Sequence, residues 1–473
     1  MNCIFTLFNN TVLKGKNKVE RICVHVLLSF FFVGYFLIPF WNHLNLRTAL
    51  FDFGLQEQVI WNTSEGRWFE SSPEVDNFLG DHFSPLLLLV ALIYRLFPCS
   101  LTLFIIQSGS ATLAVWALYR ISQVHLASSK LRILFLAILV LYRPLAGMLL
   151  FDFHEIALAF PFLCVGLYFL EKKQMWIGTL LLVTAMLAKE EVGVLVSMIG
   201  MYFFVIRKQK FGIFLFIYGA LYSLFSIFFL IPYFRNGMPS DSLERYSYLG
   251  TEPLMLYKEI IHRPTLLMRE IISREKIVYF FKLFSVVPPL ILVFPEVLFL
   301  VLPAFFINFL SNSSAQVSTN AQYDVLTTVA IFYSLIFALK KISQEQLNKR
   351  YLSKSSTYIG LIFVAVLVNV LIIHKHPLWS HIFIENRRED RKALIEITQN
   401  IPKEATLYVS NNLGAHLAKY ENIYLFDPPW LPQIHKPEYI VIDTKEYSGY
   451  YDFESTPEYK LIEKKGNILL YGR

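Results

Sequence analysis

Long apolar runs are the feature that most constrains how this chain can fold. One extends from about residue 22 to residue 41, and others, including 100–120 and 211–232, also reach about 20 residues. A helix of that length crosses a hydrocarbon core of about 30 Å. Charged residues make up only 17% of the chain, against about 25% in a typical soluble domain. The sequence therefore predicts an α-helical polytopic membrane protein.

Basic residues predict how the spans are oriented. Lys14, Lys16, Lys18 and Arg21 precede the first apolar run, and the cytoplasmic ends of spans carry an excess of lysine and arginine. The N-terminus is therefore expected in the cytoplasm. The same run ends without a small-residue cleavage pattern, so it is expected to remain as a signal anchor. These features predict an integral protein of the plasma (inner) membrane.

About eleven crossings follow from this orientation. The apolar segment 83–97 is expected to be a re-entrant or interfacial helix, because counting it as a crossing would place the basic stretch RKQK (207–210) outside. Segments 42–83 and 234–276 are then outer loops. The expected spans are 22–41, 100–120, 131–149, 156–170, 174–189, 191–206, 211–232, two within 277–310, 325–340 and 356–374.

The residues after about 385 have a different character. ENRREDRKALIEITQN (385–400) has the periodicity of an amphipathic helix, and the segment 411–420 begins with asparagine, a good helix cap. We therefore predict a membrane domain at 1–375 and a small extracytoplasmic α/β domain at 385–473. Its expected strands are 405–410, 422–426, 438–443 and 467–472.

Neither a cysteine framework nor a nucleic-acid site is expected. Cys3, Cys23, Cys99 and Cys164 lie in or beside apolar segments and have no CxxC spacing, so we interpret them as small core residues. No basic stretch is interleaved with aromatic residues, so we expect no nucleic-acid partner.

Ionisable residues recur where the predicted spans reach the outer face. FDFGLQEQVIWN (51–62) follows the first span, FDFHE (151–155) follows the third, and AMLAKEEVG (185–193) joins the next pair. Ionisable groups at membrane depth usually face a protein interior or a wet cavity. We expect a shared polar site, although separate solvated loop ends would explain each group singly. The residues expected at this site are Asp52, Glu57, Asp81, His82, Asp152, His154, Glu155, Lys189 and Glu190.

These residue types predict a transfer reaction at the membrane surface. A carboxylate such as Asp52 can act as general base toward an acceptor hydroxyl, and we expect Glu57, Asp81 and His82 in the same catalytic group. Lysine or a cation can neutralise a phosphate leaving group. A donor carried on a lipid phosphate suits such a site, since its tail stays in the bilayer.

A divalent cation, Mg²⁺ or Mn²⁺, is a possible cofactor. Asp152, His154 and Glu155 supply the oxygen and nitrogen ligands that bind such an ion, and these residues are expected to hold either the cation or the donor phosphate. Lys189 and Glu190 are expected to bind substrate. Gln322 and Tyr323, in a second outer loop, are expected to bind an acceptor hydroxyl.

The motifs resemble a known family. FDFGLQEQVIWN, NFLGDHFSPLLLL, LFDFHEIALA and AKEEVG, followed by NNLGAHLAKYENIYLF, are similar to the membrane proteins grouped as domain of unknown function 2079, over about residues 45–445. That family resembles, more distantly, the GT-C glycosyltransferases. The resemblance implies a GT-C-like fold and sugar transfer from a polyprenyl-phosphate donor, with inversion at the anomeric carbon.

The GT-C resemblance extends to particular residues. Asp52 matches the acidic residue of the first outer loop, and Asp152, with Glu155 close by, matches a second acidic motif. Lys189 matches the lysine of a Thr-Lys motif, although Ala188 precedes it here. The histidine in FDFHE and the acids after Lys189 depart from the pattern, which leaves metal dependence and donor type open.

Three functions remain open from the sequence. The first is a glycosyltransferase whose partners are membrane lipids and a polyprenyl-phosphate-linked sugar, with an unidentified acceptor. The second is a lipid or amphiphile transporter, favoured by the prolines at 288, 289, 295 and 303, because discontinuous spans often form transport sites. The third is a non-catalytic membrane scaffold. Segment 234–276 is either a lid over the site or an ordinary wet loop.

Overall fold

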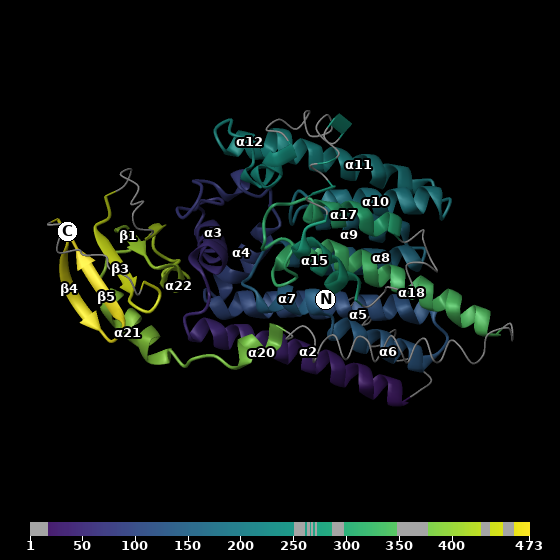
Figure 1. Ribbon diagram of the computed structural model, residues 1–473, viewed down its shortest axis with the longest axis horizontal. Helices are drawn as coiled ribbons and strands as arrows, with labels where there is room; N and C mark the ends of the chain where they lie inside the picture. Colours follow the sequence, from purple (N-terminus) through teal and green to yellow (C-terminus); the bar gives the residue numbers. More distant parts are fainter. Residues whose placement is uncertain are drawn as a thin grey trace.

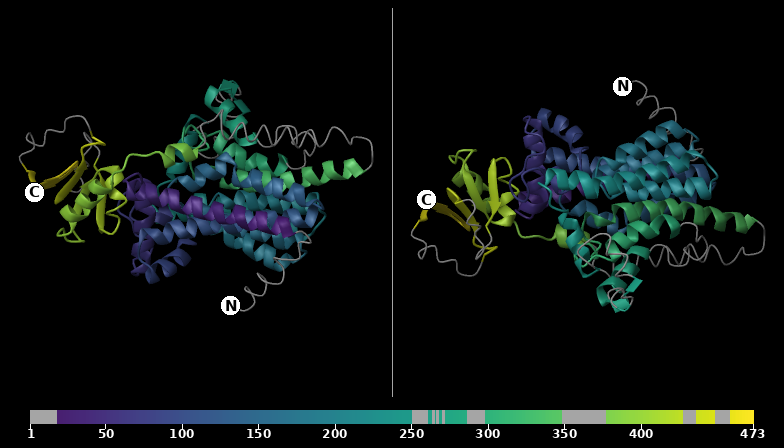
Figure 2. Two further views of the ribbon diagram at one scale, coloured as in Figure 1. Left: turned by 90° about the horizontal axis from the view of Figure 1, so that it is seen from below. Right: turned by 90° about the horizontal axis from the view of Figure 1, so that it is seen from above.

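The fold consists of a helical bundle with a small β-sheet beside one of its ends (Figures 1 and 2). The computed structural model describes residues 18–249, 272–285, 298–347, 377–426, 436–447 and 458–473, with a few residues between 261 and 269. The helices of the bundle are α2 (Lys18–Leu44), α4 (Leu87–Leu96), α5 (Ser100–His125), α6 (Ser129–Val140), α7 (Arg143–Leu150), α8 (Ile156–Glu171), α9 (Met175–Met186), α10 (Val192–Val205), α11 (Phe211–Phe225), α12 (Ile231–Phe234), α15 (Arg274–Phe284), α17 (Leu298–Phe309) and α18 (Val325–Leu347).

Local sequence explains where several of these helices begin, end and bend. The Ser128 hydroxyl accepts a hydrogen bond from the Leu131 N–H and caps α6. Pro144 lies in the first turn of α7. N–H groups in the first turn have no acceptor within the helix, so proline's lack of an N–H costs no hydrogen bond there. The break between α6 and α7 bends this segment by 45°.

Fewer helices have the length of a full span than the sequence analysis expects. Within the described residues, four are long and apolar enough, or five if the bent α6–α7 pair is one span. α8, α9 and α10 are apolar but have 16, 12 and 14 residues, and at 1.5 Å per residue they fall short of a ~30 Å core. The count of eleven is therefore not confirmed, and the expected span 356–374 lies outside the described residues.

The interpretation of segment 83–97 as a re-entrant or interfacial helix stays a prediction. The segment contributes α4, a helix of only 10 residues, which is shorter than a span.

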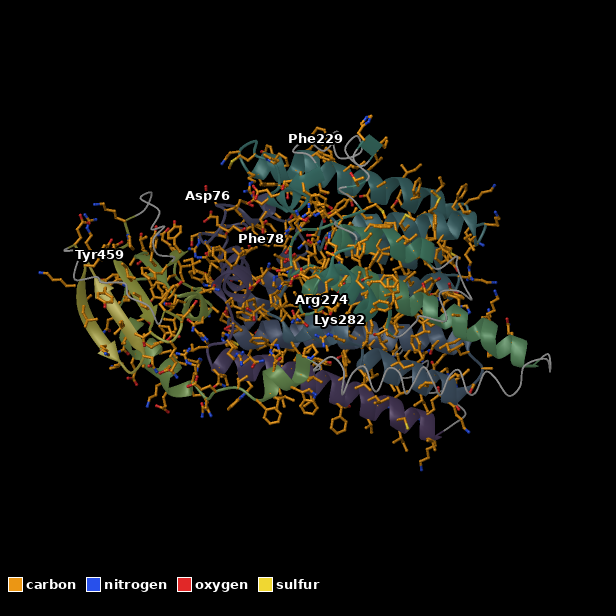
Figure 3. All side chains as sticks on the ribbon, in the orientation of Figure 1. Asp76, Phe78, Phe229, Arg274, Lys282 and Tyr459 are labelled. Carbon is orange, nitrogen blue, oxygen red and sulfur yellow. The ribbon has the colours of Figure 1, made fainter. Side chains whose placement is uncertain are left out.

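Apolar side chains such as Phe229, which is 64% exposed, project from the outer surface of the bundle (Figure 3). Outward apolar side chains are what a lipid-facing surface requires.

Glycines bring α10 and α11 into close contact. A Cβ added at Gly193 would lie 2.6 Å from the Gly219 carbonyl oxygen, and one added at Gly200 would lie 2.6 Å from the Gly212 carbonyl oxygen. Small residues that allow close backbone approach are typical of helix packing in membranes. This pair holds the loop Lys189–Glu191, which precedes α10, against the end of α11, where the Ser223 hydroxyl donates to the Glu190 carbonyl at 2.6 Å.

The C-terminal residues form a five-stranded sheet in the order β2-β1-β3-β5-β4. β1 is parallel to β2 and β3, whereas β5 is antiparallel to β3 and β4. The four expected strands are confirmed, but β4, which is charged and largely exposed, was not predicted. The helix expected at 385–400 is confirmed, and the one expected at 411–420 is shorter. The elements are α20 (Pro377–Ile382), α21 (Arg388–Thr398), β1 (Thr406–Val409), α22 (Asn411–Gly414), β2 (Asn422–Leu425), β3 (Tyr439–Asp443), β4 (Lys460–Lys465) and β5 (Ile468–Gly472).

This sheet unit packs directly on the segment that follows α2. That segment contains a π-helix, η1 (Leu50–Gly54), and α3 (Leu55–Ser64). Leu50 is fully buried in one apolar cluster with residues of α21 and the sheet. Its N–H donates to the Asn411 side-chain oxygen at 2.9 Å, and the Gln58 amide donates to the Tyr420 carbonyl at 2.8 Å. The C-terminal unit therefore fixes the backbone that carries Asp52.

Candidate functional site

Asp52 and the FDFHE stretch meet although they lie about a hundred residues apart. η1 carries Asp52, and the short connection between α7 and α8 carries Asp152 and His154. His154 Nε2 lies 3.4 Å from Asp52 Oδ1, and Asp152 Oδ2 accepts a hydrogen bond from the Ala49 N–H at 2.8 Å. Phe53 and Phe153, which follow the two acids in sequence, are fully buried and anchor both stretches.

The surroundings of Asp152 and His154 change the pKa of both groups. Burial and the nearby Asp52 carboxylate raise the pKa of Asp152 to about 7. Burial alone would lower the pKa of His154, but its contact with Asp52 outweighs this effect and raises the pKa. His154 therefore holds its proton more tightly than a free imidazole, and it lies against the Asp52 carboxylate, which is itself 32% exposed and open to an incoming group.

Glu155 and Lys189 form a buried ion pair behind this cluster. The Lys189 ammonium donates to Glu155 Oε1 at 2.7 Å, and the Gln56 amide donates to Glu155 Oε2 at 2.7 Å. Burial alone would raise the pKa of Glu155, but Lys189 and neighbouring histidines lower it to about 2. Gln56 lies on α3, so the pair connects the Asp52 segment to the loop before α10.

His82 forms the third part of the polar network. Its Nδ1 lies 3.1 Å from Glu190 Oε1, and its Nε2 lies 3.8 Å from Asp81 Oδ2. Burial opposes protonation of the ring, but the two acids raise the pKa of His82 to about 9. His82 is therefore a cation at neutral pH, and through the neighbouring residues Glu190 and Lys189 it is connected to Glu155.

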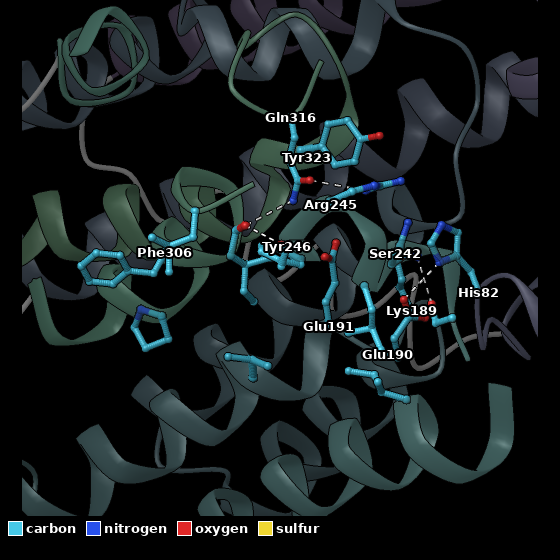
Figure 4. A pocket seen from close by; sticks show the side chains of 17 residues that line it. His82, Lys189, Glu190, Glu191, Ser242, Arg245, Tyr246, Phe306, Gln316 and Tyr323 are labelled. Atoms are coloured by element: carbon cyan, nitrogen blue, oxygen red, sulfur yellow. Dashed lines mark hydrogen bonds and ion pairs between the residues drawn. The ribbon is translucent and has the colours of Figure 1, made fainter. Parts of the chain in front are cut away.

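A cavity of about 360 Å³ lies beside Lys189 and His82 (Figure 4). One end is polar and the other is a wall of apolar side chains from α10, α17 and the π-helix at Ser226–Leu230. The 3₁₀ helix Asp241–Leu249 covers it with Arg245 and Tyr246. The lining residues are His82, Lys189, Glu190, Glu191, Val194, Ile227, Ser240, Ser242, Leu243, Arg245, Tyr246, Pro303, Phe306, Ile307, Leu310, Gln316 and Tyr323.

Arg245 is a functional candidate that the sequence analysis missed. It stacks on the Tyr323 ring, with 5.4 Å from the guanidinium carbon to the ring centroid, and donates to Gln316 at 3.4 Å. Within the described part of the chain, no carboxylate lies within ion-pair distance of it. The only sequence signal was the Tyr- and Arg-rich stretch 234–276, whose described part does cover the cavity.

Seven of the expected residues are not among those that line this cavity: Asp52, Glu57, Asp81, Asp152, His154, Glu155 and Gln322. Gln322 is buried and is not among its lining residues, although Tyr323 is. Glu57 accepts hydrogen bonds from the Tyr94 hydroxyl at 2.7 Å and from the Ser100 hydroxyl at 2.9 Å, and burial raises its pKa. Glu57 instead lines a second cavity next to the sheet unit. The catalytic role of Glu57 and the acceptor role of Gln322 stay predictions.

The expected metal ligands do not point at one another. Glu155 is bound by Lys189 and Gln56, whereas Asp152 and His154 face Ala49 and Asp52. Among the described residues, no group of three or more His, Cys, Asp and Glu side chains has the arrangement of a metal site. This geometry does not fit the three-ligand Mg²⁺ or Mn²⁺ site, whose existence stays a prediction.

The fold and the site together define a membrane protein. Its helical bundle contains a cavity with charged side chains at one end and an apolar wall at the other. The sequence profile of the family described as "Predicted membrane protein (DUF2079)" matches residues 42–467, and the chain belongs to this family. The family resemblance expected from the motifs is thereby confirmed. No curated protein matches the sequence significantly.

Solved structures share the fold at low sequence identity. ArnT from Cupriavidus metallidurans bound to undecaprenyl phosphate is similar, with a TM-score of 0.52 and 11% identity over 93% of this chain and 97% of that one. The same protein in the apo state gives a TM-score of 0.51 and 11% identity over 93% and 96% of the two chains. The GT-C resemblance is thus confirmed for the fold.

Proposed function

We propose that this protein is a membrane glycosyltransferase that moves a sugar from a polyprenyl-phosphate donor to an acceptor on the outer face of the membrane. The observation that carries the proposal is the cavity of about 360 Å³ that combines an apolar wall with three basic side chains. In this proposal the N-terminus is cytoplasmic and the sheet unit is extracytoplasmic.

The chemistry of the cavity suits a lipid phosphate. Arg245 is the basic residue best placed for the anion, because Lys189 and His82 already contact Glu155 and Glu190 and Arg245 has no such partner among the described residues. Guanidinium groups bind phosphate through paired hydrogen bonds. Phe306, Ile307 and Leu310 would contact the first isoprene units of the tail.

In this proposal Asp52, whose side chain is 32% exposed, acts as the base. It accepts a proton from the acceptor hydroxyl as the oxygen attacks the anomeric carbon, and the bond from that carbon to the phosphate oxygen breaks. The phosphate leaves with the bonding electrons, where Arg245 and Lys189 neutralise its charge. His154 holds the Asp52 carboxylate in position. The shared fold supports the proposed donor class, since the similar ArnT structure was solved with undecaprenyl phosphate.

Native mass spectrometry of protein purified gently from its own membrane tests the proposal. Wild type and Glu65→Gln, which removes an exposed charge at the end of α3, should carry a polyprenyl phosphate or its sugar adduct. Arg245→Gln should lose that lipid about tenfold or more, because a hydrogen bond to a charged group is worth about 1.5–3 kcal/mol. Asp52→Asn should keep the donor, with the sugar attached, and transfer nothing.

Two results would contradict the proposal. One is full transfer by Asp52→Asn. The other is that no lipid phosphate is bound to any form while the protein remains functional in cells. Movement of a lipid across liposomes without a covalent product would favour the transporter instead.

A further inference from the structure

A second cavity, of about 310 Å³, lies between the sheet unit and the helical bundle. α21 and the segment 416–420 form one side, and α3 and the start of α5 form the other. Arg391, Lys403 and Lys419 line it, and Glu57 is the only acid among its described lining residues. None of these groups belongs to the donor cavity described above.

The positive charge in this cavity is poorly balanced. Glu57 is already bound by the Tyr94 and Ser100 hydroxyls. Lys419 donates to the Pro98 carbonyl at 2.6 Å, and the Lys403 ammonium lies 3.8 Å from the Tyr420 ring centroid. Neither contact neutralises a charge. Lys403 is exposed and Arg391 and Lys419 are half-buried, so three like charges face one cavity with little to offset their mutual repulsion, and the arrangement is suited to a bound anion.

Two buried polar atoms also lack partners at this place. Arg391 Nε and His416 Nε2 are buried with no hydrogen-bond partner among the described residues, and both side chains line the cavity. Buried donors and acceptors are nearly always satisfied. Burial lowers the pKa of Arg391, and burial together with the neighbouring Lys419 lowers that of Lys403, as expected where cations lack a counterion.

The position of the cavity relates it to the membrane surface. Cys99 and Ser100 line it and follow α4 directly, whose last residues are apolar and open, with Leu96 73% and Phe97 64% exposed. Apolar side chains of this kind face lipid in a membrane protein. The cavity therefore lies within a few residues of apolar side chains that suit a lipid-facing surface.

We propose that this cavity is a second binding site, for a phosphate oxyanion held by Arg391, Lys403 and Lys419 between the sheet unit and the bundle. The phosphate belongs either to an anionic lipid headgroup or to a soluble phosphate-bearing molecule. Because Leu50 and Gln58 also join the two parts, the bound anion adds to the contacts that position the Asp52 segment.

Labelling of Cys99 provides a readout local to this cavity, since this thiol is exposed there. The full-length protein is placed in phosphatidylcholine nanodiscs, and the rate of maleimide addition to Cys99 is followed by peptide mass spectrometry. The added probes are inorganic phosphate, with chloride at equal ionic strength as reference, and, separately, nanodiscs that contain phosphatidylglycerol. The ratio of rates with and without the probe is compared within each variant.

The expected result is slower labelling of wild type and of Lys392→Gln, which removes an exposed charge on the same helix. In Arg391→Gln and Lys403→Gln, the probe concentration that gives half protection should rise about 10- to 100-fold. Protection by inorganic phosphate would identify a soluble oxyanion, and protection only by phosphatidylglycerol a lipid headgroup. Absence of protection by both probes, or equal protection in Arg391→Gln, would overturn the proposal, whatever the outcome at the donor cavity.

Discussion

The Glu155–Lys189 pair shows how single residues hold this site together. Both side chains are almost fully buried, and the pair connects FDFHE to the loop before α10. Removing one partner of a buried pair leaves an uncompensated charge, which costs far more than the pair itself contributes. Each residue is therefore needed for the fold whatever its role in catalysis.

Single neutralisation of this pair should be strongly destabilising. Glu155→Gln or Lys189→Met should lower the free energy of unfolding by ~3–5 kcal/mol, and the double variant should lose less than the sum of the two. Denaturant unfolding in detergent micelles measures this double-mutant cycle. Strictly additive losses would show that the two groups do not interact.

Asp152 predicts a dependence of stability on pH. Its pKa in the folded protein, about 7, lies above the ordinary value of 3.8, so the folded state keeps a proton that the unfolded chain releases. Its contribution to stability therefore falls as pH rises from about 4 to about 7 and is constant above that range. Asp152→Asn cannot ionise, so the free energy of unfolding of the variant minus that of wild type should grow across this interval.

The same unfolding series checks this prediction with Asp76→Asn as a control for charge removal in the outer segment. A difference between Asp152→Asn and wild type that stays constant from pH 4 to pH 7 would contradict the raised pKa of Asp152.

The sequence predicted most of the residues at this site, but it did not predict Arg245. His82, Lys189 and Glu190 lie beside apolar runs. Ionisable side chains at such positions usually face the protein interior and pair with one another. Arg245 lies in a hydrophilic loop, where an arginine is unremarkable by pattern. Its position in the cavity depends on how the helix Asp241–Leu249 folds back over α10 and α17, which is a tertiary contact.

At the scale of elements, the α10–α11 pair positions the loop that carries Lys189. The two helices touch through glycine backbones, so no side chain larger than hydrogen fits at Gly200, whereas a Cβ at Gly109 on α5 would meet nothing within 4 Å. Replacing each glycine by leucine therefore distinguishes the effect of close packing at Gly200 from the general effect of replacing a helical glycine, which Gly109 measures.

Gly200→Leu should destabilise the protein and disturb the loop before α10. Overpacking of a tight contact costs about 1–3 kcal/mol or more, and here the obstacle is the backbone of α11. Gly109→Leu should be close to neutral. Thermal unfolding of both variants in detergent provides the comparison, and equal midpoints would refute the close contact.

The lengths of the helices explain why the number of spans was not predictable. Apolar periodicity located α8, α9 and α10 correctly, but it cannot distinguish a full crossing from a helix that ends inside the bundle against polar loops. The loops at Asp152 and Lys189 interrupt the apolar run because they turn into the site. α8, α9 and α10 therefore each have one end beside the candidate site.

At the scale of the whole molecule, the sheet unit and the bundle meet where the candidate site is formed. The alternating pattern predicted four of the five strands because buried strands leave a clear signature, whereas the exposed β4 does not. The contact between the sheet unit and η1 was not predictable, since it joins residues more than 300 positions apart. This contact places Asp52 and the second cavity at the junction of the sheet unit with the bundle.

One structure determination tests the central claim directly. Cryo-electron microscopy of the protein in nanodiscs with added undecaprenyl phosphate should show the phosphate within hydrogen-bond distance of Arg245 or Lys189, with the tail leaving along Phe306 and Leu310. The lipid phosphate bound elsewhere on the protein, with this cavity empty at saturating lipid, would contradict the assignment of the donor site.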